Sequence, residues 1–134
     1  MRGLENRTAI VTGGGSGIGE AICERLAEEG VHLAILDRDG DGAERVAEKV
    51  RGLGVNAHAY QVDISGYADV VGAVEAAEAA LGQIDVLVNN AGWDKMVSFL
   101  DTDEVLRDQV IAVNLKGPIN VTHAVARRMA HRKS

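Results

Sequence analysis

Four short apolar runs alternate with longer amphipathic segments along the chain. The runs are Thr8–Thr12, His32–Leu36, Asn56–Val62 and Ile84–Val88. The first run is almost continuously apolar, which is typical of a parallel strand buried on both faces. The third run alternates only weakly between apolar and polar residues, so we expect it nearer the edge of a sheet.

The segments between the runs carry apolar residues at helical spacing. A helix is expected to follow a glycine cluster, with Ile18, Ile22 and Leu26 on its buried face. The next two helices are expected to bury Ala43, Val46, Ala47, Val50 and Leu53, and then Val70, Val74, Ala77 and Leu81. A glycine suited to a helix C-terminus follows each of the three helices: Gly30, Gly54 and Gly82.

The last segment, from roughly Asp103 onward, predicts one long helix with two apolar faces. One face carries Leu106, Val110, Val113, Gly117 and Val121, and the other carries Ile111, Leu115, Pro118, Thr122, Val125 and Met129. Because only one face can cover a sheet, the other needs a further partner. We favour a subunit interface, and hence a homo-oligomer through this helix; the alternative is that the remainder of a longer domain covers the second face.

Strands that alternate with helices at this spacing indicate βαβ units. The fold class is therefore α/β, with a doubly wound parallel sheet, helices on both faces and right-handed crossovers. The chain carries no internal repeat, low-complexity tract or interdomain linker. Residues 1–134 are expected to form a single domain.

Composition and charge exclude several classes of function. The net charge of −6 argues against nucleic-acid binding, which depends on basic residues. No apolar run is long enough to cross a membrane, and the N-terminus has no apolar signal core. The single cysteine, Cys23, and the four histidines show no metal-ligand spacing, so no metal is expected. We expect a cytoplasmic, reducing compartment.

The glycine cluster between the first strand and the first helix is the strongest chemical signal. A tight turn at that place presents backbone N–H groups at a helix N-terminus, which binds anions, and a dinucleotide pyrophosphate is the expected one. A nucleoside triphosphate loop is excluded because Glu20 stands where lysine is required. A hydrolase nucleophile elbow is excluded because Ile18 replaces a required glycine. The remaining alternative is a purely structural turn.

Two aspartates end the second and third apolar runs. Asp37 lies where a carboxylate should meet the adenosine ribose, and it would repel a 2′-phosphate, so NAD is favoured over NADP. The adjacent Arg38 weakens this preference for NAD, since a guanidinium could bind the 2′-phosphate of NADP. Asp63 could accept from the adenine amino group, because strand carboxyl ends form the ligand edge of such a sheet. The alternatives are a turn-initiating role for Asp37 and a cap of the turn at Ser65–Tyr67 for Asp63.

Three motifs together resemble the short-chain dehydrogenase/reductase family. They are Thr12-Gly13-x-x-x-Gly17-x-Gly19, Asp63, and Asn89-Asn90-Ala91-Gly92 after the fourth apolar run. The match covers essentially the whole chain but only the N-terminal half of the family's domain. The resemblance implies a Rossmann-like sheet in the order 3-2-1-4, incomplete at its C-terminal end, and a parent reaction that interconverts a secondary alcohol and a ketone with NAD.

The resemblance also implies roles for individual residues. It implies that the pyrophosphate is surrounded by Gly13, Ser16, Gly17, Ile18 and Gly19. It implies that Asp37 binds the ribose, that Asp63 and Ile64 border the adenine, and that the cofactor cleft is lined by Asn90, Ala91 and Gly92. Asn114 matches the family's catalytic asparagine, which helps to hold a water in a proton relay.

The sequence offers a physical reason for the Asn114 role. Pro118 lacks an N–H, so the carbonyl of Asn114 loses its helical hydrogen bond and could hold that water. The alternative is that Pro118 merely bends the helix around the core. The run from Asn89 to Asp94 also resembles bacterial dehydrogenases that act on alicyclic 2-hydroxyacyl-CoA thioesters, which adds an acyl-CoA to the possible substrates.

The family's Tyr-x-x-x-Lys pair is absent from these residues. Tyr60 is followed four residues later by Ile64, and Tyr67 by Val71. The general acid–base group that alcohol oxidation needs is therefore missing, and the chain is expected to be inactive alone. Two alternatives stay open: a non-catalytic dinucleotide-binding module, and an assembly protein that uses an exposed strand edge and the last helix.

Overall fold

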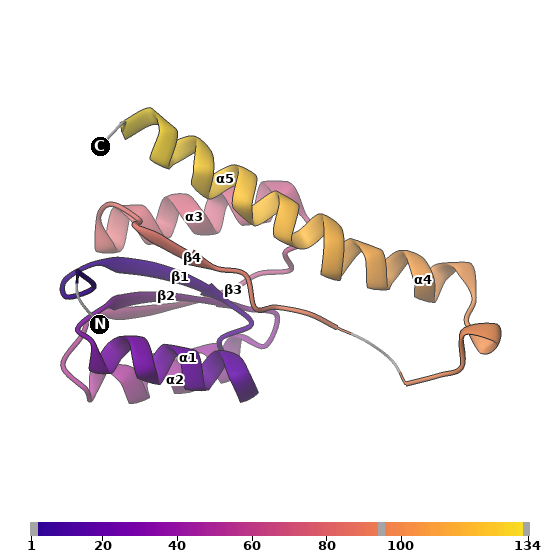
Figure 1. Ribbon diagram of the computed structural model, residues 1–134, viewed down its shortest axis with the longest axis horizontal. Coiled ribbons are helices and arrows are strands. Elements are labelled where there is room, and N and C mark those ends of the chain that lie inside the picture. The colour runs from indigo at the N-terminus through magenta and orange to yellow at the C-terminus, as the bar shows by residue number, and fades with distance from the viewer. Residues whose placement is uncertain (1–2, 94–95, 133–134) are drawn as a thin grey trace.

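The computed structural model describes residues 3–93 and 96–132, and its centre is a four-stranded parallel sheet. The strands are β1 (Thr8–Thr12), β2 (His32–Asp37), β3 (Ala57–Gln61) and β4 (Val86–Val88). Their order is β3-β2-β1-β4, as the sequence predicted (Figure 1). Val11 of β1 pairs with Ile35 on one side and Val88 on the other, so β1 is a central strand.

Helices cover both faces of the sheet (Figure 1). The helices of the described chain are α1 (Gly17–Glu28), α2 (Gly40–Arg51), α3 (Tyr67–Leu81), α4 (Glu104–Ile111) and α5 (Gly117–Arg132), with short helical segments η1 (Phe99–Asp101) and η2 (Ala112–Lys116). Of these, α1 and α2 lie on one face of the sheet and α3 and α5 on the other. Alternate residues of β1 divide the core between the two faces. Val11 packs with the buried residues of α1 and α2, whereas Ile10 packs with those of α3 and α5.

The buried face of α1 agrees only in part with the predicted one, since Ile22 and Leu26 are partly buried against the core but Ile18 is not. Gly19, Cys23 and Ala27 are buried, while Ile18 is 75% exposed. The helix therefore turns its smallest side chains toward the sheet, because a Cβ at Gly14 would lie 3.1 Å from the Cys23 sulfur and leave no room for larger groups. Burial raises the pKa of Cys23 to about 12, so this thiol is an unreactive packing group.

The C-terminal helical stretch is continuous, as predicted, but its winding changes within it. The π-helical segment η2 separates α4 from α5, and α4 extends beyond the end of the sheet (Figure 1). Val113, Val121 and Val125 are buried, whereas Ile111 and Leu115 remain exposed. The stretch thus packs on the core through one side of α5, whereas α4 has no buried residue.

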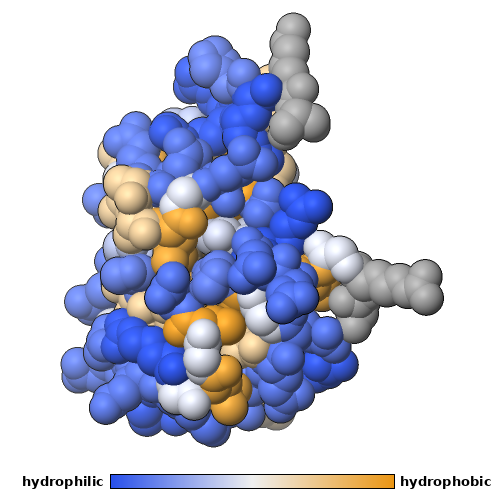
Figure 2. All heavy atoms as spheres, turned by 90° about the vertical axis from the view of Figure 1, so that its left-hand side faces the viewer, coloured by the Kyte–Doolittle hydropathy of each residue, from blue (hydrophilic) through white to orange (hydrophobic). Residues whose placement is uncertain are grey.

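Other boundaries differ only slightly. Leu53 lies beyond the end of α2 and is 50% exposed, so its predicted burial is wrong. The last strand begins at Val86 rather than Ile84, although Ile84 itself is buried. None of the described helices is long and apolar enough to cross a membrane. The amino-end side of the sheet is mostly hydrophilic, with small hydrophobic areas between the polar side chains (Figure 2).

Candidate functional site

A cleft of about 500 Å³ lies at the carboxyl ends of the strands. The predicted site residues that line it are Gly13, Ser16, Gly17, Ile18, Asp37, Ile64, Asn90, Ala91 and Gly92. Arg38, which the sequence raised as a possible phosphate partner, and residues outside the predicted set complete the wall: Leu36, Asp39, Val62, Trp93 and Val113. Three predicted residues, Gly19, Asp63 and Asn114, lie beside the cleft rather than on its wall. The carboxyl edge of an open parallel sheet is the usual place for a ligand.

The glycine turn that enters α1 needs glycine at several positions, either for its backbone angles or for lack of space. Gly13 and Gly17 have φ angles of +66° and +56°, which L side chains rarely adopt. A Cβ at Gly13 would lie 2.8 Å from the Ala91 Cα, and one at Gly19 would overlap the Gly13 carbonyl. Gly19 therefore acts by letting α1 pack against the turn, while the other glycines bring the backbone to the cleft surface.

The N-terminus of α1 faces the cleft with its backbone donors uncapped. Ser16 precedes the helix in an extended conformation, and within the described residues its side chain makes no capping hydrogen bond. The first helical hydrogen bond runs from the Glu20 N–H to the Ser16 carbonyl at 3.1 Å. The N–H groups of residues 17–19 thus have no acceptor within the helix, and the helix dipole adds positive potential there. By contrast, the Asp39 carboxylate caps α2.

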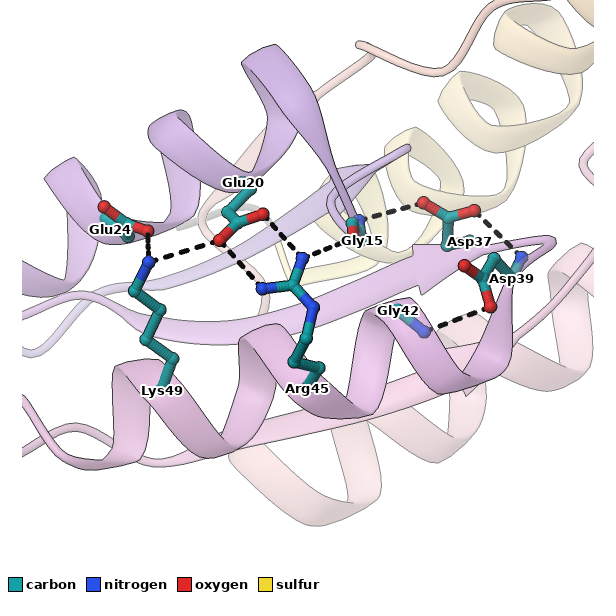
Figure 3. Close-up of polar contacts among 8 residues, drawn as sticks. All are labelled: Gly15, Glu20, Glu24, Asp37, Asp39, Gly42, Arg45 and Lys49. Atoms are coloured by element: carbon teal, nitrogen blue, oxygen red, sulfur yellow. Dashed lines mark hydrogen bonds and ion pairs between the residues drawn. The ribbon is translucent and has the colours of Figure 1, made fainter.

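Asp37 is held at the end of β2 by two backbone donors (Figure 3). Its Oδ2 accepts from the Gly15 N–H and its Oδ1 from the Asp39 N–H, both at 2.9 Å. The second contact is the turn-initiating role that the sequence left open. Because each carboxylate oxygen has a further lone pair, Asp37 can still accept from two hydroxyl groups.

A buried hydroxyl joins β1 to the loop after β4. Thr12 Oγ1 accepts from the N–H groups of Asn90 and Ala91, each at 3.0 Å, and donates to the Val88 carbonyl at 3.5 Å. The Asn90 side chain in turn donates to the Gly13 carbonyl at 3.1 Å. Thr12 was recognised as part of a motif but not as a site residue, since this junction forms between segments far apart in sequence.

Asp63 lies outside the cleft, in an adjacent hollow that Arg38 and Asp69 also line. Its Oδ1 accepts from the Ser65 N–H at 3.0 Å and from the Ser65 hydroxyl at 2.7 Å. These hydrogen bonds hold the pKa of the Asp63 carboxyl below its usual value. The structure therefore shows the turn contact, and the adenine contact stays a prediction.

Asn114 lies in the π-helical segment, next to the loop that follows β4. Its Oδ1 accepts from the Trp93 N–H at 3.1 Å, and its Nδ2 donates to the carbonyls of Trp93 and Val110. A Cβ at Gly92 would lie 2.9 Å from that Oδ1. The side chain thus holds the end of the cleft wall, and π segments are frequent at functional sites. Asp94, from the run compared with acyl-CoA dehydrogenases, lies outside the described residues.

The comparison with protein families decides the family of the chain. The family model described as short chain dehydrogenase matches residues 7–134. The chain belongs to the short-chain dehydrogenase family. Among the residues that the structure describes, no group of three or more histidine, cysteine or acidic side chains could hold a metal ion.

Individual relatives agree with this assignment. The chain is 41% identical over 133 residues to the oxidoreductase UcpA of Salmonella typhimurium, and 36% identical over 129 residues to 2-(S)-hydroxypropyl-CoM dehydrogenase 3 of Xanthobacter autotrophicus. These matches cover 99% and 96% of this chain, but 50% and 51% of the relatives. A solved NAD⁺-bound xylitol dehydrogenase superposes with a TM-score of 0.93 at 33% identity, over 98% of this chain and 51% of that structure. The chain therefore spans about half the length of the relatives that it matches.

Proposed function

We propose that residues 1–134 form a domain that binds a nicotinamide dinucleotide, with NAD preferred over NADP. The observation that carries this proposal is the uncapped N-terminus of α1, which opens into the same cleft as the anchored carboxylate of Asp37. The first feature suits a pyrophosphate, and the second suits a ribose diol. A negative carboxylate also disfavours a 2′-phosphate.

The residues present fit such a cofactor. The glycine turn leaves a cradle without side chains for the pyrophosphate, and Val62 and Ile64 supply apolar wall for the adenine. We propose that Asp63, which lies between these two residues in sequence and lines the adjacent hollow, accepts from the adenine amino group. The loop Asn90–Gly92 forms the wall toward the nicotinamide, which supplies the hydride-transfer chemistry when bound.

The parent reaction is proposed to interconvert a secondary alcohol and a ketone. In support, the names of two relatives denote dehydrogenases of hydroxylated substrates, hydroxypropyl-CoM and xylitol. A small alcohol or an acyl-CoA thioester are the substrate classes we propose. In that reaction Asn114 would hold a water of the proton relay, while the proton donor must come from residues outside this sequence, which has no Tyr-x-x-x-Lys. We place the domain in the cytoplasm, consistent with its lone buried thiol.

Calorimetric titration of the purified chain tests the cofactor proposal. We expect NAD to bind more tightly than NADP. Asp37→Asn should weaken NAD binding and reduce the difference in affinity between NAD and NADP. The same samples are then assayed for NAD reduction with a panel of secondary alcohols, where we expect no turnover. If neither dinucleotide produces heat or a thermal shift, the cofactor role is wrong; robust turnover would show that the chain has its own proton donor.

We also propose self-association through the last helical stretch. Ile111, Leu115 and Ile119 are 54–59% exposed on adjacent turns, which is a large apolar surface for a free helix face. Within the described residues β4 pairs on one side only, with β1, so an edge is open as well. Light scattering should therefore show a dimer or larger species that Leu115→Glu dissociates, and a wild-type monomer would contradict this.

A further inference from the structure

Arg45 of α2 joins the glycine turn to α1 (Figure 3). Its Nη2 donates to the Gly15 carbonyl at 3.2 Å and to Glu20 Oε1 at 2.7 Å, and its Nη1 donates to Glu20 Oε2 at 3.1 Å. Lys49, one turn further along α2, pairs with Glu20 at 3.2 Å and also with Glu24. Both cations thus bind the same helix, but of the two only Arg45 is seen to contact the turn.

The two peptide groups that flank Gly15 are fixed from opposite sides. Asp37 accepts from the Gly15 N–H, and Arg45 donates to the Gly15 carbonyl. A Cβ at Gly15 would lie 2.8 Å from the Asp37 Oδ2 and 2.9 Å from the Ala43 nitrogen, so the turn also packs closely on α2. Gly15 therefore has little freedom to rotate while both contacts persist.

The Gly15 carbonyl and the Ser16 N–H belong to one planar peptide group. In a trans peptide these two bonds point in opposite directions. A carbonyl that is drawn toward α2 therefore turns the Ser16 N–H away from α2. Ser16 lines the cleft at the N-terminus of α1, so this donor belongs to the set available to an anion.

The ion pair itself contributes little to stability. The Arg45 side chain is 56% exposed, and ion pairs at such positions have small net effects. Hydrogen bonds from Arg45 and Lys49, with a smaller contribution from their charges, nevertheless hold the pKa of Glu20 at about 2, so Glu20 remains ionised and keeps the guanidinium in place at neutral pH. Arg45 is thus orientated by Glu20 and orientates Gly15.

We propose that Arg45 is a positioning residue of the dinucleotide site, fixing the Gly15–Ser16 peptide so that its N–H is presented to the pyrophosphate. This inference rests on the proposed cofactor function. It assigns to α2 a part in phosphate recognition, although Arg45 itself points at the back of the turn.

The test compares Arg45→Gln with Lys49→Gln. Each variant removes one positive charge from the exposed side of α2 and one partner of Glu20, but only Arg45→Gln loses the Gly15 contact. Since a hydrogen bond from a charged donor is involved, we expect Arg45→Gln to raise the NAD dissociation constant about tenfold and Lys49→Gln to change it less than about twofold. Urea midpoints should be similar for both variants. An equal loss in both would overturn the proposal, because overall charge would then explain it.

Two further measurements separate geometry from charge and from the cofactor role. Arg45→Lys keeps the charge but replaces the planar, two-nitrogen guanidinium with a single ammonium that lacks its fixed geometry, so its NAD affinity should stay reduced. Wild-type affinity would overturn the proposal. In the ligand-free protein, Arg45→Gln should speed amide hydrogen exchange at Gly15, and Lys49→Gln should not. Unchanged exchange contradicts the positioning role, whereas a wild-type chain that binds no dinucleotide contradicts only the proposed function.

Discussion

Replacement of Thr12 by valine tests the junction between β1 and the loop that follows β4. Valine has nearly the same shape, but it cannot accept the two N–H groups of Asn90 and Ala91 or donate to the Val88 carbonyl. Thr12 is fully buried. Because each backbone donor left without a partner costs about 1 kcal/mol or more, we expect the free energy of unfolding to fall by roughly 2–3 kcal/mol.

Thr8 provides the matched control on the same strand. It is also buried, but its hydroxyl makes one long contact, to the Leu81 carbonyl at 3.4 Å. Thr8→Val leaves no backbone donor unpaired at that hydroxyl, so a loss below about 1 kcal/mol is expected. Both free energies come from urea unfolding followed by circular dichroism, with fluorescence of Trp93 reporting the loop separately. Equal losses for the two variants would refute the argument that Thr12 organises the loop by accepting hydrogen bonds from its backbone N–H groups.

Three other predictions concern α1 and the C-terminal helices. Gly19→Ala should destabilise the fold by roughly 1–3 kcal/mol, measured in urea, because its Cβ would press on the Gly13 carbonyl. Glu20→Gln should remove a small stabilisation that the wild type has above pH 4.5 and loses between pH 4.5 and about 2, since folding lowers the pKa of this carboxyl but the ion pair is exposed to solvent. Acid titration by circular dichroism measures the difference, and identical acid curves would contradict the prediction. Asn114→Ala should release the Trp93 backbone and lower tryptophan fluorescence anisotropy while helix content stays the same.

The sheet and the cleft floor could be predicted because their signals are local. Near-continuous apolar runs marked the buried strands, and the glycines after β1 marked the turn that the cleft surrounds. Asp37 could be placed from the end of its strand alone. In each case the residues of one short segment predict both its secondary structure and its place at the carboxyl edge of the sheet.

The face of α1 was predicted only in part, for a physical reason. Hydrophobic periodicity favours large side chains, and so it selected Ile18, Ile22 and Leu26. Close approach of a helix to a sheet favours small ones: the structure buries Gly19 and Cys23 fully, leaves Ile22 and Leu26 partly buried against the core, and exposes Ile18. Ile18 is exposed and lines the cleft. Its exposure is therefore compatible with the prediction that it lies beside a cofactor.

Contacts between distant segments leave no periodic signal. Arg45 is 30 residues from Gly15, and Thr12 is 78 residues from Asn90. The π segment was also missed: the sequence pointed to Pro118 as the source of a kink, whereas the helix changes its winding over the turn before that proline. Such features depend on packing that a single segment does not encode.

The cleft wall is held by hydrogen bonds from elements behind it. The buried Asn120 of α5 donates to the Ile64 carbonyl at 2.9 Å, Asn114 holds Trp93, and Thr12 holds the start of the loop after β4. All of these partners lie within the half of the domain that the chain contains. The proposed cofactor site therefore has its own internal support, separate from the residues that would supply the proton in the proposed reaction. Binding and turnover should accordingly be separable properties of this sequence, with dinucleotide affinity sensitive to Arg45 and Thr12 even where no alcohol is oxidised.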